Sequence, residues 1–231
     1  MRRLLDAQDK AVQLFDEVGR RQMVRAGITE RALSDEIRDL AADMFGITRH
    51  WHKRIVRAGV NTLETARDNP ADRAIADDDI VFLDFGPIFE EWEADFGRTY
   101  VLGDDPQKLA LRDDLPRIWN AGRAYFEANP DITGEQLFDH VVELSEAAGW
   151  HFGGHIAGHL VGHFPHEVIP GDKIESYVAP GSTKPMRRKD SSGNQYHWIL
   201  EVHLVEPGRR YGGFVEELLD LRPQQGVHPA G

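Results

Sequence analysis

The 231-residue sequence contains no cysteine, which excludes disulfide bonds, thiolate metal ligands and a cysteine nucleophile. This absence is compatible with a reducing compartment, and we expect a cytoplasmic protein. The first residues, MRRLLDAQDK, lead into acidic and polar residues instead of a long apolar stretch, so we expect no secretory signal. No apolar run is long enough to cross a bilayer, so we expect no membrane partner.

Basic residues are also scarce, because 27 lysines and arginines face 39 aspartates and glutamates, which gives a formal net charge of −12. Such a charge repels a phosphate backbone unless the basic residues gather on one face. The one notable basic cluster is Arg187, Arg188 and Lys189, and an exposed loop explains it more simply. We therefore expect no nucleic-acid partner.

Apolar residues recur at helical spacing in four segments. Thr29 and Thr133 are placed to cap the second and fourth of these segments, and Pro106 lies near the start of the third. The predicted helices cover residues 3–25, 29–45, 105–128 and 133–148.

Runs that favour β-structure occupy much of the remaining chain. The predicted strands cover residues 80–83, 99–102, 150–160, 196–205 and 212–220, and residues 54–79 are expected to hold a strand followed by loops. Helices followed by strands occur twice, so the sequence predicts an α+β fold with two similar halves. We expect a single catalytic domain over residues 1–231, with N-terminal helices in residues 1–45 packed on it.

Two aspartates flank a predicted hairpin. Asp84 closes one apolar strand, and Asp95 comes shortly before the next. A carboxylate at the end of a buried strand is costly unless a positive charge compensates it, and a divalent cation is the strongest such partner. Aspartate at a strand end is also a common turn former or ion-pair partner, so this pair alone leaves both interpretations open.

Five histidines fall in one short glycine-rich segment: His151, His155, His159, His163 and His166. The glycines disfavour a helix, but helical and extended structure alike turn the first four imidazoles the same way. A single histidine is more often hydrogen-bonded locally. Several neutral imidazoles each need a partner, however, and a metal ion or a substrate is an economical one.

Two glutamates interrupt apolar runs near the end of the chain. Glu201 lies in Trp-Ile-Leu-Glu-Val, and Glu216 lies in Gly-Phe-Val-Glu-Glu-Leu-Leu. A charge at such a position either faces solvent or is coordinated, and each glutamate taken alone leaves both alternatives open.

Together these motifs resemble the pita-bread metallohydrolases, which include methionine aminopeptidase, aminopeptidase P, prolidase and the non-peptidase creatinase. The segments Phe-Leu-Asp84-Phe-Gly and Asp95-Phe-Gly-Arg-Thr-Tyr are similar to the two aspartate motifs of this family. Gly-His159-Leu-Val-Gly is similar to its histidine motif, and Glu201 and Glu216 stand where its glutamates belong. The resemblance extends from about residue 28 to about residue 220. It implies a pita-bread fold, which is a pseudo-twofold antiparallel sheet covered by helices.

The resemblance also implies a set of roles. Asp84 would chelate one divalent cation, Asp95 and Glu216 would bridge two cations, and His159 and Glu201 would complete the other. The cations would be Mn²⁺, Co²⁺, Fe²⁺ or Zn²⁺, and the four carboxylates would balance two dications. Three residues would be catalytic: His155 and His166 would contact the substrate, and Glu201 would also move a proton.

The sequence departs from the family pattern around the expected substrate pocket. The family's first active-site histidine has no clear counterpart, since His50 and His52 lie too early and residues 61–65 contain none. Val202 follows Glu201 where the family has proline, the loop 180–195 is long and polar, and the roles of His151 and His163 are open. The separate N-terminal domain of prolidase-like members is not expected.

The resemblance implies a metal-dependent hydrolase, namely an aminopeptidase or Xaa-Pro dipeptidase that uses a metal-bridging hydroxide. Manganese is one expected cation, a short peptide or small molecule is the expected substrate, and a homodimer is the expected assembly. An alternative is a creatinase-like hydrolase or lyase acting on a small nitrogenous metabolite. A catalytically silent binding module is a third hypothesis, disfavoured because all five ligand types are present.

Overall fold

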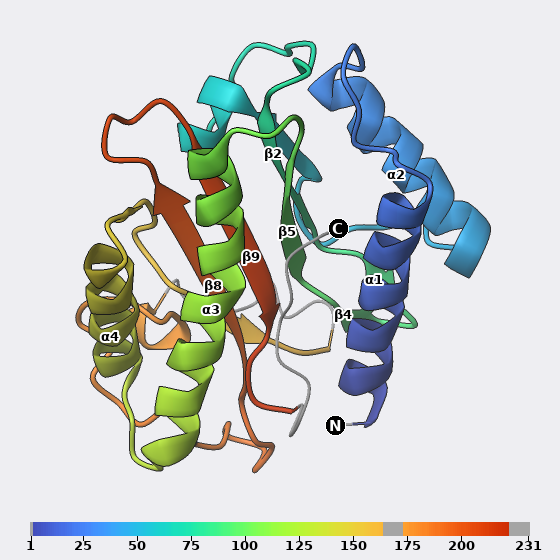
Figure 1. Ribbon diagram of the computed structural model, residues 1–231. Helices are drawn as coiled ribbons and strands as arrows, with labels where there is room; N and C mark the ends of the chain where they lie inside the picture. The colour runs from blue at the N-terminus through green and yellow to red at the C-terminus, as the bar shows by residue number, and fades with distance from the viewer. Residues whose placement is uncertain (1, 164–172, 222–231) are drawn as a thin grey trace.

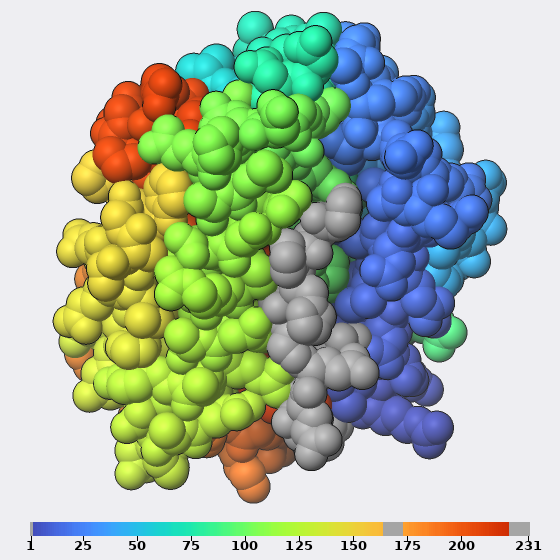
Figure 2. Space-filling model, viewed as in Figure 1, coloured from blue at the N-terminus to red at the C-terminus, as the bar shows by residue number. Residues whose placement is uncertain are grey.

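The computed structural model describes residues 2–163 and 173–221, and it shows an antiparallel sheet with two pairs of helices packed against one face. In Figure 1, α1 and α2 lie on the right and α3 and α4 on the left. The helices are α1 (Arg2–Arg20), α2 (Glu30–Phe45), α3 (Pro106–Ala128) and α4 (Gly134–Ala147). Figure 2 shows that these four helices make up most of the described surface seen from this side.

The predicted helix starts are confirmed, and the capping side chains explain them. The hydroxyl of Thr29 accepts a hydrogen bond from the amide of Ala32 at 3.1 Å, which begins α2. Thr133 and Gln136 form a reciprocal capping box at the start of α4. Pro106 occupies the first turn of α3, where its missing amide hydrogen costs nothing. The first helix ends at Arg20 and not at residue 25.

The sheet has the strand order β1-β2-β5-β9-β8-β6, and β7 pairs with β8 beside this path. Every pairing is antiparallel. The strands of this sheet are β1 (Ile55–Ala58), β2 (Ile80–Phe85), β5 (Phe96–Val101), β6 (His151–Phe152), β7 (Leu160–Val161), β8 (His197–Val205) and β9 (Gly212–Leu218). A separate hairpin joins β3 (Ile88–Phe89) to β4 (Trp92–Glu93), and two short 3-10 helices cover Gly59–Leu63 and Ile174–Ser176.

The prediction of one strand over residues 150–160 is wrong, because only the two-residue strands β6 and β7 form at its ends. The backbone between them passes very close to β8. Gly158 has a φ of 139°, and a Cβ there would overlap the carbonyl oxygen of Ile199. A side chain is therefore excluded at this point, and the segment leaves regular β-structure.

Two hydrophobic cores lie between the helices and the sheet. Leu83 and Phe85 of β2 are buried in the core that α1 and α2 cover. Leu200 of β8 and Val215 of β9 are buried in the core that α3 and α4 cover. Neighbouring side chains along a strand alternate between the two faces of the sheet. The residues next to these core positions on each strand therefore point to the face away from the helices.

No helix in the described part of the chain is both long enough and apolar enough to span a membrane.

Candidate metal centre

Strand register places three of the predicted site residues in one row across the sheet. Asp84 on β2 pairs with Gly97 on β5, Gly97 pairs with Glu216 on β9, and Glu216 pairs with Glu201 on β8. Paired residues of adjacent strands share a face, so the three carboxylates point to the side away from the helices. Gly97 contributes no side chain to this row, and a Cβ there would meet the Phe214 ring at 2.7 Å.

Hydrogen bonds hold β5 and β9 together where this row crosses them. Thr99 Oγ1 donates to the carbonyl of Phe214 and accepts from its amide, both at 2.7 Å. The Arg98 guanidinium donates to the carbonyl of Glu216 at 3.3 Å and pairs with the carboxylate of Glu217. These contacts fix the position of Glu216 relative to β5.

Asp95 and His159 meet at the same site from loops beside the strands. His159 Nε2 lies 3.1 Å from Asp95 Oδ2 and 3.6 Å from Glu216 Oε1. The other ring nitrogen of His159, Nδ1, lies 2.8 Å from the carbonyl oxygen of Leu160 and donates its hydrogen there. In the neutral ring the lone pair of Nε2 therefore points at the carboxylates, as it does in a histidine that ligates a metal.

The cluster holds four carboxylates and two imidazoles, so positive charge compensates its negative charge only in part. Burial raises the pKa values of Asp84 and Glu201 to about 7. Burial, together with the neighbouring Asp95, raises the pKa of Glu216. Burial would also raise the pKa of Asp95, but hydrogen bonds and charge from neighbouring imidazoles hold it at about 2. Without a cation, the cluster can thus lower its energy only by binding protons.

The donor atoms fit divalent cations. Two groups of side chains each bring their ligand atoms within 4.8 Å of one another: His52 with Asp84 and Asp95, and Asp95 with His159 and Glu216. Carboxylate oxygens with imidazole nitrogens suit Mn²⁺, Fe²⁺, Co²⁺ and Zn²⁺. Asp84 Oδ1 is buried and accepts no hydrogen bond from the described residues, which leaves it available to a cation.

The cluster forms the floor of a cavity of about 460 Å³. Ile55, Phe82 and Phe214 supply apolar walls, while exposed Lys53 and Arg67 also line it. A cavity of this size accommodates a small molecule or a short peptide.

A family model describes most of this sequence. The model of metallopeptidase family M24 matches residues 2–192. The chain belongs to metallopeptidase family M24. The M24 chain is also similar to an Xaa-Pro dipeptidase from Lactobacillus helveticus, with 27% identity over 128 residues, which are 55% of this chain and 34% of that protein.

Solved structures show the same fold. A dipeptidase from Pyrococcus horikoshii matches with a TM-score of 0.72 and 19% identity, over 100% of the M24 chain and 61% of that protein. A dipeptidase from Mycobacterium ulcerans matches with a TM-score of 0.70 and 23% identity, over 97% of the M24 chain and 60% of that protein. The predicted pita-bread fold is confirmed. The M24 chain spans about three fifths of the length of these solved structures.

The glycine-rich segment does not turn its histidines the same way, contrary to the prediction. His159 is buried in the cluster, and His155 is exposed but lines the cavity. His151 and His163 are exposed and do not line it, and His163 instead lies 3.6 Å from Glu91. Because the chain is neither helical nor continuously extended here, a spacing of four residues does not select one face. His166 lies outside the described residues.

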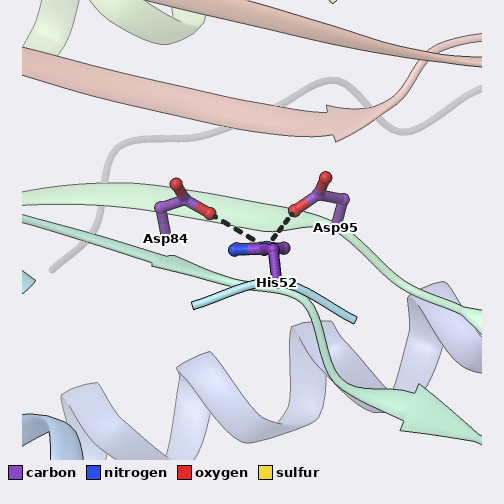
Figure 3. Close-up of side chains that lie close together, drawn as sticks. All are labelled: His52, Asp84 and Asp95. Atoms are coloured by element: carbon purple, nitrogen blue, oxygen red, sulfur yellow. Dashed lines mark hydrogen bonds and ion pairs between the residues drawn. The ribbon is translucent and has the colours of Figure 1, made fainter. Parts of the chain in front are cut away.

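His52, which lies too early in the sequence to be a clear counterpart of the family's first active-site histidine, nevertheless reaches the site. His52 Nε2 lies 3.1 Å from Asp95 Oδ1 and 3.5 Å from Asp84 Oδ1. Figure 3 shows both carboxylates pointing toward its ring. Burial acts to lower the pKa of His52, but the charges of Asp84 and Asp95 outweigh it and raise the pKa to about 9. The cluster of His50, Trp51 and His52 just before β1 was the sequence signal for this contact.

His203 is a second cavity residue that the motifs did not single out. It lies two positions after Glu201 on β8, so it faces the same side of the sheet. Its Nε2 donates to the carbonyl of Thr62 at 2.8 Å. Burial lowers the pKa of His203, which keeps the ring neutral and leaves Nδ1 as an acceptor. The alternation of polar and apolar residues in Glu-Val-His was the signal that could have found it.

Proposed function

We propose that the protein is a metal-dependent hydrolase that splits a dipeptide, or removes one residue from the N-terminus of a short peptide, with preference for an Xaa-Pro bond. Membership of metallopeptidase family M24 and the likeness to an Xaa-Pro dipeptidase support this function. The observation that carries it is the row of Asp84, Glu216 and Glu201 across four strands, with Asp95 and His159 beside it in one cavity.

In this proposal the five residues hold two divalent cations. Asp84 would hold one cation, Asp95 and Glu216 would be shared between both, and His159 and Glu201 would hold the other. Two observations support the assignment: the carboxylates of Asp95 and Glu216 both lie close to His159 Nε2, and Nδ1 of the same ring donates to a backbone carbonyl. Bound cations of this kind supply Lewis acidity, which lowers the pKa of water and polarises a carbonyl group. The candidate metals are Mn²⁺, Co²⁺, Fe²⁺ and Zn²⁺.

The chain's own residues would then manage protons and substrate. Glu201 is suited to accept and return a proton, because burial raises its pKa to about 7, close to neutral pH. His155, exposed at the cavity wall, would contact the substrate carbonyl. His166 keeps the substrate-binding role that the family resemblance implies.

Two positively charged side chains at the cavity wall favour a substrate with a free carboxylate. Lys53 and Arg67 both line the cavity, and both are exposed. In a dipeptide the terminal carboxylate lies one residue beyond the scissile bond, so a positive charge there would bind it by charge-assisted hydrogen bonds. This arrangement supports a dipeptidase over an enzyme for long peptides.

The proposal is tested by hydrolysis of a small peptide panel. Protein loaded with Mn²⁺ or Co²⁺ is given Ala-Pro, Pro-Ala, Ala-Ala and Ala-Pro-amide. We expect Ala-Pro to be cleaved best and the amide more slowly. Arg67→Ala should raise the KM for Ala-Pro but not for its amide, whereas Arg117→Ala, at an exposed site on α3, should change neither.

Two results would reject the peptidase. One is the absence of turnover on any peptide by protein that holds two cations, and the other is unchanged turnover by Glu216→Gln, which would point to a contaminant. Hydrolysis of a small nitrogenous metabolite by the same metal-loaded protein would instead support the creatinase-like alternative.

We also propose that residues 1–231 act as one catalytic domain in a cytoplasmic homodimer. The packing of α1 against β4 and β5, and of α2 against β1, supports the single domain. The lack of cysteine is compatible with a reducing compartment. Sedimentation velocity tests the assembly, and a mass of twice 26.1 kDa is expected.

A further inference from the structure

We propose that His52 is a further protein ligand of the metal centre, binding through Nε2 beside Asp84 and Asp95. This inference rests on the proposed metal-dependent function and extends its ligand set to a second imidazole. Its starting point is the pair of potential ligand groups that share Asp95, because each group contains one imidazole, His52 or His159.

Backbone contacts hold the segment before β1 against the end of β2. The amide of Trp51 donates to the carbonyl of Gly86 at 2.9 Å, and the amide of Ile88 donates to the carbonyl of Arg49 at 3.2 Å. A Cβ on Gly86 would overlap the rings of both Trp51 and His52. The close approach therefore depends on glycine at position 86, and it brings His52 to the site from 43 residues before Asp95.

The orientation of the ring is also fixed. His52 Nδ1 lies 2.7 Å from the carbonyl oxygen of Lys53, so it donates its hydrogen there, and a cation that replaced the proton on Nε2 would meet a lone pair directed at the carboxylates. His159 has the same arrangement with the carbonyl of Leu160. A backbone carbonyl on one ring nitrogen, with the other nitrogen aimed at a cluster of anionic oxygens, is the usual setting of a ligating histidine.

Trp51 supports both imidazoles. Its ring centroid lies 4.6 Å from that of His52 and 5.4 Å from that of His159, with edge-on geometry in each case. The indole nitrogen donates to the carbonyl of Ala94 at 3.2 Å, which ties the ring to the residue before Asp95. Both histidines therefore pack against one aromatic ring, each with its Nε2 close to Asp95.

A second imidazole changes the chemistry of the centre. The cation next to Asp84 would bind one nitrogen in addition to carboxylate oxygens, so both cations would have mixed nitrogen and oxygen ligands. Imidazole suits Zn²⁺, Co²⁺ and Fe²⁺, whereas sites of oxygen alone suit Mn²⁺ and Mg²⁺. Loss of His52 should therefore weaken Zn²⁺ binding more than Mn²⁺ binding.

The test follows the imidazole nitrogens directly. Protein with ¹⁵N-labelled histidine is freed of metal and titrated with Zn²⁺ while the ring resonances are recorded by NMR. We expect the Nε2 resonances of His52 and His159 both to move to values typical of metal ligation. The resonance that is missing in the spectrum of His52→Gln is assigned to His52. An unshifted His52 Nε2 in protein that holds two Zn²⁺ would overturn the inference.

Calorimetry on variants gives a second measurement. His52→Gln and His52→Ala should each weaken one of the two Zn²⁺ sites by at least about 10- to 100-fold. His163→Ala, at an exposed histidine outside the cavity, is the matched control and should bind as the wild type does. Two unchanged sites in both His52 variants would contradict the inference. No Zn²⁺ binding by the wild type would instead reject the proposed function.

Discussion

At the scale of single residues, Asp84 shows how strongly the site depends on a cation. The residue is 7% exposed and shares the cavity with Asp95, Glu201 and Glu216. Burial raises its pKa to about 7, so the ionised carboxylate that the metal-free fold carries above about pH 7 is less favourable there than in the unfolded chain. The side chain is therefore suited to binding metal and poorly suited to stability.

We predict that Asp84→Asn stabilises the metal-free protein and weakens its stabilisation by metal. At pH 8 without metal, loss of the buried charge should raise the midpoint of thermal unfolding by a few degrees, at about 2–4 °C per kcal/mol. Addition of Mn²⁺ should then raise the midpoint far less than in the wild type. Asp113→Asn, at a site where the side chain is 54% exposed, should behave as the wild type. A metal-free Asp84→Asn protein less stable than the wild type would contradict the argument.

Glu206 provides a prediction for pH dependence away from the metal centre. Its carboxylate accepts hydrogen bonds from the Arg210 guanidinium at 3.0 and 3.2 Å, and these lower its pKa to about 2. An acid whose pKa is lowered by folding stabilises the fold above its unfolded pKa of about 4.3, and this stabilisation is lost as the pH falls toward 2.

Urea denaturation of metal-free protein measures this effect. The wild type should be more stable than Glu206→Gln at pH 7, and the difference in unfolding free energy should shrink as the pH falls from about 4.3 toward 2. Arg210→Ala should remove most of that pH dependence, since it removes the first cause of the lowered pKa. If the difference in unfolding free energy between the wild type and Glu206→Gln stayed constant between pH values of about 4.3 and about 2, the ion pair of Glu206 and Arg210 would not be its cause.

At the scale of elements, the helices could be predicted because their start signals are local in the sequence. The strand predicted over residues 150–160 failed because contacts with distant residues decide the structure there. Thr29 and Thr133 begin their helices by hydrogen bonds to residues three positions away, which a sequence displays directly. The failed strand over 150–160 is different. Glycine is required at position 158 because the carbonyl of Ile199, on strand β8, occupies the space of a Cβ. No local sequence pattern could predict this contact.

Gly158 and Gly162 form a matched pair for testing that contact. Gly158→Ala should destabilise the protein by about 2–3 kcal/mol or more, because alanine strongly disfavours a φ of 139° and its Cβ would overlap Ile199. Gly162→Ala should have little effect, since no atom of the described residues lies within 4 Å of a Cβ there. Thermal unfolding followed by circular dichroism compares them, and equal midpoints would refute the close approach.

The clustering of the candidate residues was predictable where a sequence motif contains the residue and a predicted strand contains the motif. Asp84, Glu201 and Glu216 lie within predicted apolar runs, and strand register places all three in one row. His52 was not predictable in this way. Its contact with Asp95 requires the close approach at Gly86, and the pairing of these segments follows from the fold alone.

At the scale of the whole molecule, metal binding and stability should be linked. The two helical pairs bury separate cores, and the carboxylate row crosses from the strands of one half to those of the other. Cations bound to Asp84 of β2 and Glu216 of β9 would therefore join both halves. A ligand that binds only the folded state stabilises it by about 2.7 kcal/mol at a concentration 100 times its dissociation constant.

We expect saturating Mn²⁺ or Co²⁺ to raise the unfolding midpoint of the metal-free protein by about 5–10 °C. Both halves should unfold in a single transition at the higher temperature. Asp95→Ala should abolish the rise, because this carboxylate belongs to both potential ligand groups. An equal rise in Asp95→Ala would mean that the cations bind elsewhere on this acidic protein.

The most direct test of the central claim is anomalous X-ray diffraction from crystals grown with Mn²⁺ or Zn²⁺. The account predicts two strong peaks in the cavity, both within coordination distance of Asp95 and Glu216, with Asp84 on one and His159 on the other. Crystals saturated with metal that show no peak between these carboxylates, or peaks only on the molecular surface, would contradict it.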